Sequence, residues 1–180
     1  MAHRRRWAGI WAPGELEPLP DPHGATVAAR IGGLTVCSSI LPWRNCWSRE
    51  PWIGSNTAER TEDAVKVIEA GQPDVWGGDW NHALSGREWS GSMRGRTALL
   101  AALHRLGLQV PTADSPHTLP DALSIDHVAV PSTWAIASVE RVRAEVAGVR
   151  LSDHDAYVVD VSGSPRRVRV PTIRGGGQGR

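Results

Sequence analysis

The sequence contains no phenylalanine and one tyrosine, and Lys66 is its only lysine. Its two cysteines, Cys37 and Cys46, lack the C-x-x-C spacing of a zinc site or redox pair, and outside a secretory context they are expected to stay reduced. No apolar run approaches the length of a membrane span. The basic first seven residues lack the apolar core of a signal peptide. These absences argue against a disulfide scaffold or a membrane protein and predict a cytoplasmic location.

What is present fits one ordinary globular domain. The chain has 180 residues, of which 41% are hydrophobic and 22% are charged. The formal net charge of +1 argues against a general electrostatic attachment to nucleic acid. Nearly all the basic residues are arginines, whose planar guanidinium can bind phosphate through paired hydrogen bonds. The nine tryptophans are expected mainly in the core.

Composition divides the chain into three parts. Residues 1–24 are rich in proline and arginine and predict an irregular lead-in. Residues 25–162 carry the alternating apolar segments of a folded domain. Residues 163–180 form an arginine- and glycine-rich tail that we expect to be flexible. We therefore predict a single domain flanked by two segments without regular structure.

Local signals within the domain predict both strands and helices. Two apolar runs, 25–31 and 34–41, flank Gly32-Gly33 and predict a β-hairpin. Asn56, with Glu59 three residues later, predicts a capped helix that ends at Gly71. A second helix is expected over 97–106, and further strands over 74–76, 108–110, 124–130, 133–146 and 156–161. The predicted fold class is therefore α/β or α+β.

Three short segments place acids, amides and imidazoles at predicted strand ends. They are Gly78-Asp79-Trp80-Asn81, Ile125-Asp126-His127 and Ser152-Asp153-His154. Side chains at strand ends can converge on one pocket. Each segment alone is weak evidence, because an Asp-His pair in a loop is more often a turn or a cap.

In this order and at these separations, the three segments resemble the endonuclease/exonuclease/phosphatase superfamily. That group includes pancreatic deoxyribonuclease, abasic-site endonucleases, neutral sphingomyelinases and inositol polyphosphate phosphatases. The resemblance covers about residues 25–161 and corresponds to the C-terminal half of the family domain. It implies a partial four-layer α/β sandwich with mostly antiparallel strands.

The resemblance also implies a role for each matching residue. Asp79 would orient or deprotonate the attacking water, and Asn81 would bind the phosphate oxygens through its amide. His154 would contact the scissile phosphate, with Asp126 accepting its ring N–H. Asp153 would be a ligand of Mg²⁺ or Mn²⁺, of which the intact family site holds one or two ions. We accordingly predict a hydrogen bond between Asp126 and His154.

Two departures from the family pattern affect this interpretation. The family begins with a strand bearing an Asn and a later strand bearing a Glu, the principal metal ligand. Residues 1–24 supply neither, since Glu15 and Glu17 lie in a proline-rich stretch that we do not expect to form that strand. In addition, Ser39 stands where the family often has a His or Tyr. Either the chain is truncated or it is a short protein that lost catalysis; we favour truncation because every C-terminal motif is intact.

The leading functional hypothesis is a metal-dependent phosphoesterase or nuclease domain that is weakly active or inactive as given. The alternative is a non-catalytic phosphate- or nucleic-acid-binding module derived from that fold. A third reading, in which the motifs are coincidental, stays open. We expect a phosphoester substrate, with a weak preference for nucleic acid, and self-association if a truncated sandwich exposes apolar strand faces.

Other polar residues near the motifs receive structural interpretations. His127 is expected to pack or to make a strand-end hydrogen bond. His82 is interpreted either as a residue that supports the site from behind or as an exposed one, and we favour the exposed position. Asp155 is expected to cap the following turn. Two interpretations stay open for the loop arginines Arg87, Arg94 and Arg96. They could bind an anionic substrate, but a solvated position is at least as well supported.

Overall fold

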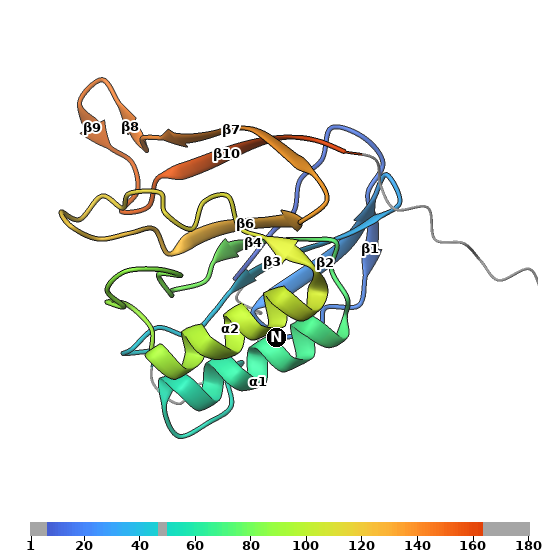
Figure 1. The fold of residues 1–180 in the computed structure, drawn as a ribbon, viewed down its shortest axis with the longest axis horizontal. Helices are drawn as coiled ribbons and strands as arrows, with labels where there is room; N and C mark the ends of the chain where they lie inside the picture. The colour runs from blue at the N-terminus through green and yellow to red at the C-terminus, as the bar shows by residue number, and fades with distance from the viewer. Residues whose placement is uncertain (1–6, 47–49, 164–180) are drawn as a thin grey trace, which may run out of the picture.

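The computed structural model describes residues 7–46 and 50–163 (Figure 1). Its helices are α1 (Thr57–Ala70) and α2 (Met93–Leu106). Its strands are β1 (Glu17–Leu19), β2 (Thr26–Ile31), β3 (Leu34–Ile40), β4 (Val75–Asp79), β5 (Leu108–Gln109), β6 (Asp126–Pro131), β7 (Ala135–Val142), β8 (Glu145–Val146), β9 (Val149–Arg150) and β10 (Ala156–Ser162).

One six-stranded sheet dominates the fold, in the order β1-β2-β3-β4-β6-β5. Its β3–β4 pair is parallel and its other pairs are antiparallel. Strands β7 and β10 form a separate antiparallel ribbon, and β8 pairs with β9. This mixed, mostly antiparallel arrangement confirms the predicted fold class.

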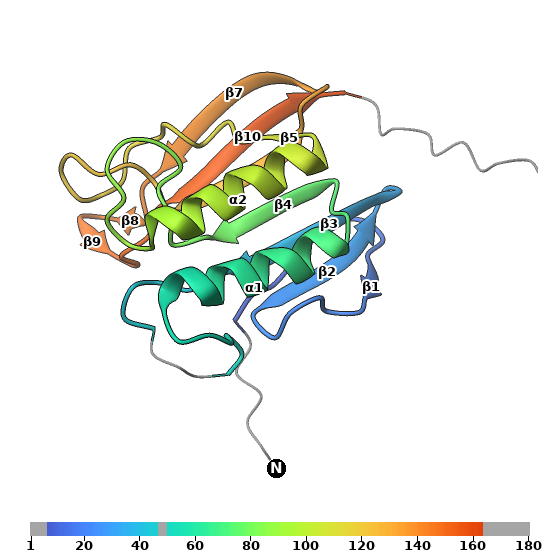
Figure 2. The ribbon, with the colours of Figure 1, turned by 60° about the horizontal axis from the view of Figure 1, so that its bottom comes forward.

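The elements are stacked in layers. In Figure 1 the two helices lie below the six-stranded sheet and the β7/β10 ribbon lies above it. Figure 2, in which the lower side comes forward, shows α1 and α2 side by side across one face of the sheet. The described residues thus supply a helix layer and two sheet layers of the predicted four-layer sandwich.

The hydrophobic core lies between the sheet and the helices. Trp76 of β4 and Ala129 of β6 are register partners, so both side chains point to the helix face, where both are fully buried. The core cluster contains Ala25, Cys37, Leu41, Cys46, Trp52, Ala64, Val65, Ile68, Trp76, Trp80, Leu84, Leu99, Ala102, Leu103 and Ala129. Because strand side chains alternate between faces, residues 77 and 79 of β4 point away from the helices.

The chain ends differ from the prediction in one respect. The lead-in over residues 1–24 is not irregular throughout, because it contains β1, which pairs with β2 of the domain. Pro18 lies in β1, and an edge strand tolerates proline because one side of its backbone needs no partner. Residues 1–6 of the lead-in and 164–180 of the predicted tail lie outside the described residues.

The hairpin prediction is confirmed. Gly32 and Gly33 separate β2 from β3 and have φ of 57° and 83°. A two-residue turn with positive φ at both positions matches the twist of the flanking strands, and glycine adopts that conformation without strain. This turn sets the register that places Cys37 and Ser39 on the helix face of β3.

Both helices begin at side-chain caps. Asn56 accepts a hydrogen bond from Glu59 N–H, as the sequence predicts for α1. The predicted start of α2 at residue 97 was wrong, because Ser92 caps Gly95 N–H and the helix begins at Met93. Serine is a favourable N-cap residue, but Ser92 lies in a glycine-rich stretch that resembles a loop, so the sequence did not reveal it as a cap.

Removing the α1 cap gives a measurable loss of stability. Asn56→Ala leaves the N–H of Glu59 without its acceptor, and we expect the free energy of unfolding to fall by about 1 kcal/mol in urea denaturation. Asn56→Ser retains an oxygen acceptor and should restore most of that loss. Equal stability of wild type and Asn56→Ala would contradict the cap.

The β7/β10 ribbon and the β8–β9 connection carry apolar side chains on the surface. The exposed ones are Val139, Val142, Val146, Val149, Leu151, Val158 and Val161. The expected self-association stays a prediction, and these residues are where it would occur. Within the described ranges, neither helix is long and apolar enough to cross a membrane.

Candidate active site

Two carboxylates meet at the end of the central strand pair. Asp79 ends β4, Asp126 begins β6, and the two are directly opposite in the antiparallel register. Opposed residues in an antiparallel pair have Cβ atoms about 5 Å apart on the same face of the sheet. Sheet pairing therefore brings together two acids that are 47 positions apart in the sequence, on the face away from the helices.

His154 completes this group from the connection that precedes β10. Its Nδ1 lies 2.8 and 3.0 Å from the two carboxylate oxygens of Asp126. The backbone N–H of His154 donates to Ser152 Oγ at 3.1 Å, which fixes the turn that carries the imidazole. The predicted hydrogen bond between Asp126 and His154 is confirmed.

Asp79, Asp126 and His154 form a compact group of donor atoms. One ligand atom of each lies within 4.8 Å of the others, and all three residues are half-buried. Among the residues that the structure describes, this is the group of acids and imidazoles with the spacing of a metal site. The oxygens of the two carboxylates are donors that suit a hard divalent cation.

Burial and charge repulsion weaken the acidity of Asp79. Burial raises the pKa of this carboxyl to about 7, and the neighbouring Asp126 carboxylate adds to the increase. His154 and the hydrogen bonds from Asn81 act in the opposite direction. Asp79 therefore gains and loses its proton near neutral pH, as a general base requires.

The charged form of His154 is favoured, whereas the charged form of Asp79 is disfavoured. Its hydrogen bond to Asp126 raises the pKa of the imidazole to about 9, although burial opposes the increase. Electrostatic attraction by Asp126, Asp79 and Asp153 favours the charged form further. At neutral pH the site therefore holds an imidazolium, which can donate to an anionic oxygen.

Asn81 is tied to Asp79 through both its backbone and its side chain. Its backbone N–H donates to Asp79 Oδ1, and its Nδ2 donates to Asp79 Oδ2, each at 3.0 Å. The second amide hydrogen goes to the carbonyl oxygen of Leu41, also at 3.0 Å. The predicted contact of Asn81 with phosphate stays a prediction, and it would require Nδ2 to exchange Asp79 for the substrate.

Asp153 is next to His154 in the sequence but is not one of the three residues of the group. The residue is exposed, and its carboxylate is not among the three donors that lie within 4.8 Å. Its backbone carbonyl accepts a hydrogen bond from Thr118 Oγ1 at 3.4 Å. The predicted role of Asp153 as a metal ligand therefore stays a prediction.

Comparison with known proteins decides the fold. No protein-family model matches the chain, and no curated protein matches it. Among solved structures it is similar to the 3′ phosphatase NExo from Neisseria bound to product DNA hairpin, with 20% identity and a TM-score of 0.51. That match covers 80% of this chain and 67% of the other. The chain has an endonuclease/exonuclease/phosphatase-like fold.

Two further solved structures are similar at lower scores. The 3′-5′ exonuclease NExo from Neisseria meningitidis has 20% identity and a TM-score of 0.49, over 78% of this chain and 66% of that one. The endonuclease domain of TRAS1, a telomere-specific non-LTR retrotransposon, has 19% identity and a TM-score of 0.47, over 86% and 70%.

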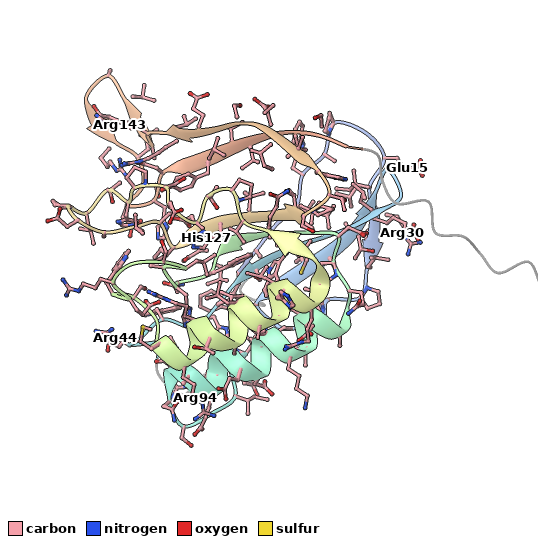
Figure 3. All side chains as sticks on the ribbon, viewed as in Figure 1. Glu15, Arg30, Arg44, Arg94, His127 and Arg143 are labelled. Carbon is pink, nitrogen blue, oxygen red and sulfur yellow. The ribbon has the colours of Figure 1, made fainter. Side chains whose placement is uncertain are left out.

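Within the endonuclease/exonuclease/phosphatase-like fold, the neighbouring histidines are structural. His127 is buried on β6, where Figure 3 labels it, and its Nε2 lies 2.9 Å from the carbonyl oxygen of His82. Burial lowers the pKa of His127 to about 4, which keeps it neutral. The prediction that His127 packs is confirmed, and the prediction that His82 is exposed was wrong, since His82 is fully buried.

Ser39 and Asp155 also belong to the framework of the fold. Ser39, where the family often has a His or Tyr, is fully buried and accepts a hydrogen bond from Trp76 Nε1 at 2.7 Å. Asp155 is more than the predicted turn cap, because its buried carboxylate pairs with Arg141 at 2.6 Å and Arg150 at 2.7 Å. These ion pairs join β7 and β9 to the residue that precedes β10.

Sequence reasoning missed two loop residues beside the group. His117 lies with its ring 6.4 Å from that of His154 and 4.6 Å from that of Trp89. Ser90 donates its hydroxyl to Asn81 Oδ1 at 3.1 Å. Both residues stand in polar loops, and no periodic pattern or motif spacing there could have identified them.

Proposed function

We propose that the chain is a divalent-metal-dependent phosphoester hydrolase domain whose site is the group Asp79, Asp126 and His154. The observation that supports it is the hydrogen-bonded Asp126–His154 pair directly opposite Asp79 in the sheet register. This arrangement offers a base near neutral pKa and a charged donor on one surface. The fold likeness to a solved 3′ phosphatase is consistent with the same class of reaction.

The donor set fits a hard cation. Asp79 and Asp126 are close enough for mutual repulsion to raise the pKa of Asp79, and a bound cation would relieve that repulsion. We propose that Asp126, with Asp153 at the edge of the group, would hold Mg²⁺ or Mn²⁺, which leaves Asp79 to act on the attacking water. When bound, the ion would neutralise the charge that develops on the phosphoryl oxygens.

The chain's own residues would divide the remaining tasks. Asp79, half-buried and titrating near pH 7, would accept the proton of the attacking water. The His154 imidazolium would donate through Nε2 to a phosphoryl oxygen, because Asp126 holds the ring by Nδ1. Asn81 would fix the orientation of the Asp79 carboxylate and contact the phosphate when substrate binds.

One observation favours the second candidate, a non-catalytic phosphate- or nucleic-acid-binding module. The group among the described residues contains two aspartates and a histidine but no glutamate, whereas the family's principal metal ligand is a glutamate. A site with fewer carboxylates binds a divalent cation more weakly. The charged His154 would remain available to bind phosphate.

Hydrolysis assays test the proposal. With Mg²⁺, we expect little turnover of bis(p-nitrophenyl) phosphate or of a DNA hairpin by the chain as given, and we expect Asp79→Asn to abolish what turnover there is. Asp160→Asn, on exposed β10, removes the same charge away from the site and should leave turnover unchanged.

Turnover measured together with phosphate binding distinguishes the two candidates. Calorimetry with inorganic phosphate should show binding that His154→Ala removes, in either case. Measurable turnover that Asp79→Asn abolishes supports the hydrolase, whereas binding without turnover supports the module. Turnover that Asp79→Asn leaves intact, together with phosphate binding that His154→Ala leaves intact, would overturn both.

A further inference from the structure

The loop between β4 and α2 reaches back to the candidate site. Its residue Ser90 contacts Asn81, and Asn81 in turn contacts Asp79. We propose that Ser90 is a positioning residue that holds the Asn81 amide in the orientation seen here, and that a buried Glu88–Arg96 ion pair holds Ser90 in place. Its kinetic consequence rests on the proposed function, whereas the positioning itself does not.

The hydrogen bonds determine which way the Asn81 amide points. Ser90 Oγ donates to Asn81 Oδ1 at 3.1 Å, which leaves Nδ2 facing Leu41 O and the Asp79 carboxylate. With the amide reversed, its oxygen would face two acceptors and its nitrogen would face the hydroxyl. Leu41 O and the Asp79 carboxylate therefore select this orientation, and the Ser90 hydroxyl holds it by supplying the one donor that Oδ1 receives there.

Three hydrogen bonds to main-chain groups hold the backbone around Ser90. Glu88 Oε1 accepts from Ser90 N–H at 3.0 Å and from Gly91 N–H at 2.8 Å. The carbonyl oxygen of Ser90 accepts from Arg44 N–H at 2.8 Å. Because these bonds involve only main-chain groups of Ser90, the hydroxyl remains available for Asn81.

The Glu88 carboxylate is held by a cation from α2. Arg96 Nη2 lies 3.5 Å from Glu88 Oε2, and the side chains are 8% and 3% exposed. Arg96 Nη1 donates to the carbonyl oxygen of Gly86 at 2.9 Å. Burying an ion pair removes both charges from water and seldom adds net stability, so a role in fixing the loop explains this pair better than a stabilising role.

His82, which lies on the core side of the same loop, holds it through hydrogen bonds. Its Nδ1 lies 2.7 Å from the carbonyl oxygen of Trp80, and its Nε2 accepts from Ser92 N–H at 3.2 Å. A Cβ added at Gly91 or Gly95 would overlap this imidazole. The glycines therefore allow the loop to close on His82, which joins the segment after β4 to the segment before α2.

Nuclear magnetic resonance of the full chain tests the orientation directly. In the wild type, the two Asn81 side-chain amide hydrogens should be well separated in shift and protected from solvent exchange. Ser90→Ala should move both signals toward those of a solvent-exposed asparagine amide and speed their exchange by about 10-fold or more, since Oδ1 loses its donor. Ser90→Thr keeps the hydroxyl and should restore the wild-type signals.

Ser85→Ala is the matched control, because Ser85 is in the same loop and its hydroxyl bonds to Asp114 instead. It should leave the Asn81 signals unchanged. Glu88→Gln, which weakens the bond to Arg96, should reproduce the Ser90→Ala spectrum. Unchanged Asn81 signals in a folded Ser90→Ala variant would overturn the proposal, as would equal changes in Ser85→Ala.

Kinetics provide a second readout where turnover is measured. Ser90→Ala should lower kcat by about 10-fold or more with little change in KM, because a misplaced reacting group affects the transition state more than binding. Altered Asn81 signals combined with turnover that does not depend on Asp79 would retain the positioning role and reject the proposed function. A change in KM alone would contradict the kinetic part of the inference.

Discussion

Replacing Asp126 with asparagine is expected to lower the pKa of His154 from about 9 toward its ordinary value of 6.5. The hydrogen bond to the Asp126 carboxylate is the largest cause of the increase, and a neutral amide removes its charge while keeping its size. Titration of the His154 ring by nuclear magnetic resonance measures the shift. At pH 8 the ring should then change from mostly charged to mostly neutral.

The same substitution should change Asp79 in a way that a general loss of structure would not. Because repulsion from Asp126 helps to raise the pKa of Asp79 to about 7, that pKa should also fall in Asp126→Asn. Asp160→Asn is the charge-matched control and should shift neither group. A His154 pKa that stays near 9 in Asp126→Asn would show that this pair does not determine the charge of the site.

The pH dependence of stability follows from the sign of each shift. The folded pKa of His154 is raised, so its pair with Asp126 contributes stability that is fully present below pH 6.5 and is lost as pH rises through about 9. The raised pKa of Asp79 acts differently, since ionising it costs stability from pH 3.8 up to about 7. Unfolding midpoints measured between pH 6 and 10 should therefore fall less in Asp126→Asn than in the wild type.

Gly78→Ala is expected to lower the free energy of unfolding by about 3 kcal/mol or more. An added Cβ would overlap the backbone carbonyl oxygen of Ser39, its register partner on the parallel strand β3. Backbone atoms in a paired strand cannot move aside as a flexible side chain can, so β3 and β4 would have to separate. Gly78 also has φ of 132°, which adds a conformational cost of about 1–3 kcal/mol.

Urea denaturation measures this loss, and Gly14→Ala is its control. Gly14 has no atom within 4 Å of an added Cβ, so its substitution should change stability by less than about 0.5 kcal/mol. Because Gly78 precedes Asp79, a folded Gly78→Ala variant should also show a displaced Asp79 pKa. A variant as stable as the wild type would contradict the close approach of β3 and β4.

The sequence by itself determined the elements that depend on neighbouring residues. Gly32-Gly33 predicted the hairpin because both turn positions require positive φ, and Asn56 with Glu59 predicted the start of α1. The order of three polar motifs resembles the endonuclease/exonuclease/phosphatase superfamily, and that resemblance predicted the fold and the contact between Asp126 and His154. Each of these signals lies within a few residues or in a fixed order along the chain.

Only the tertiary structure decided which side chains meet and which are buried. The register of β4 with β6 sets Asp79 against Asp126 and so determines the repulsion between them. Packing of the β4–α2 loop against α2 buries His82, and the same loop folds back so that Ser90 contacts Asn81. These outcomes depend on contacts between segments far apart in the sequence, whose energies arise from packing and burial and leave no local pattern to be read.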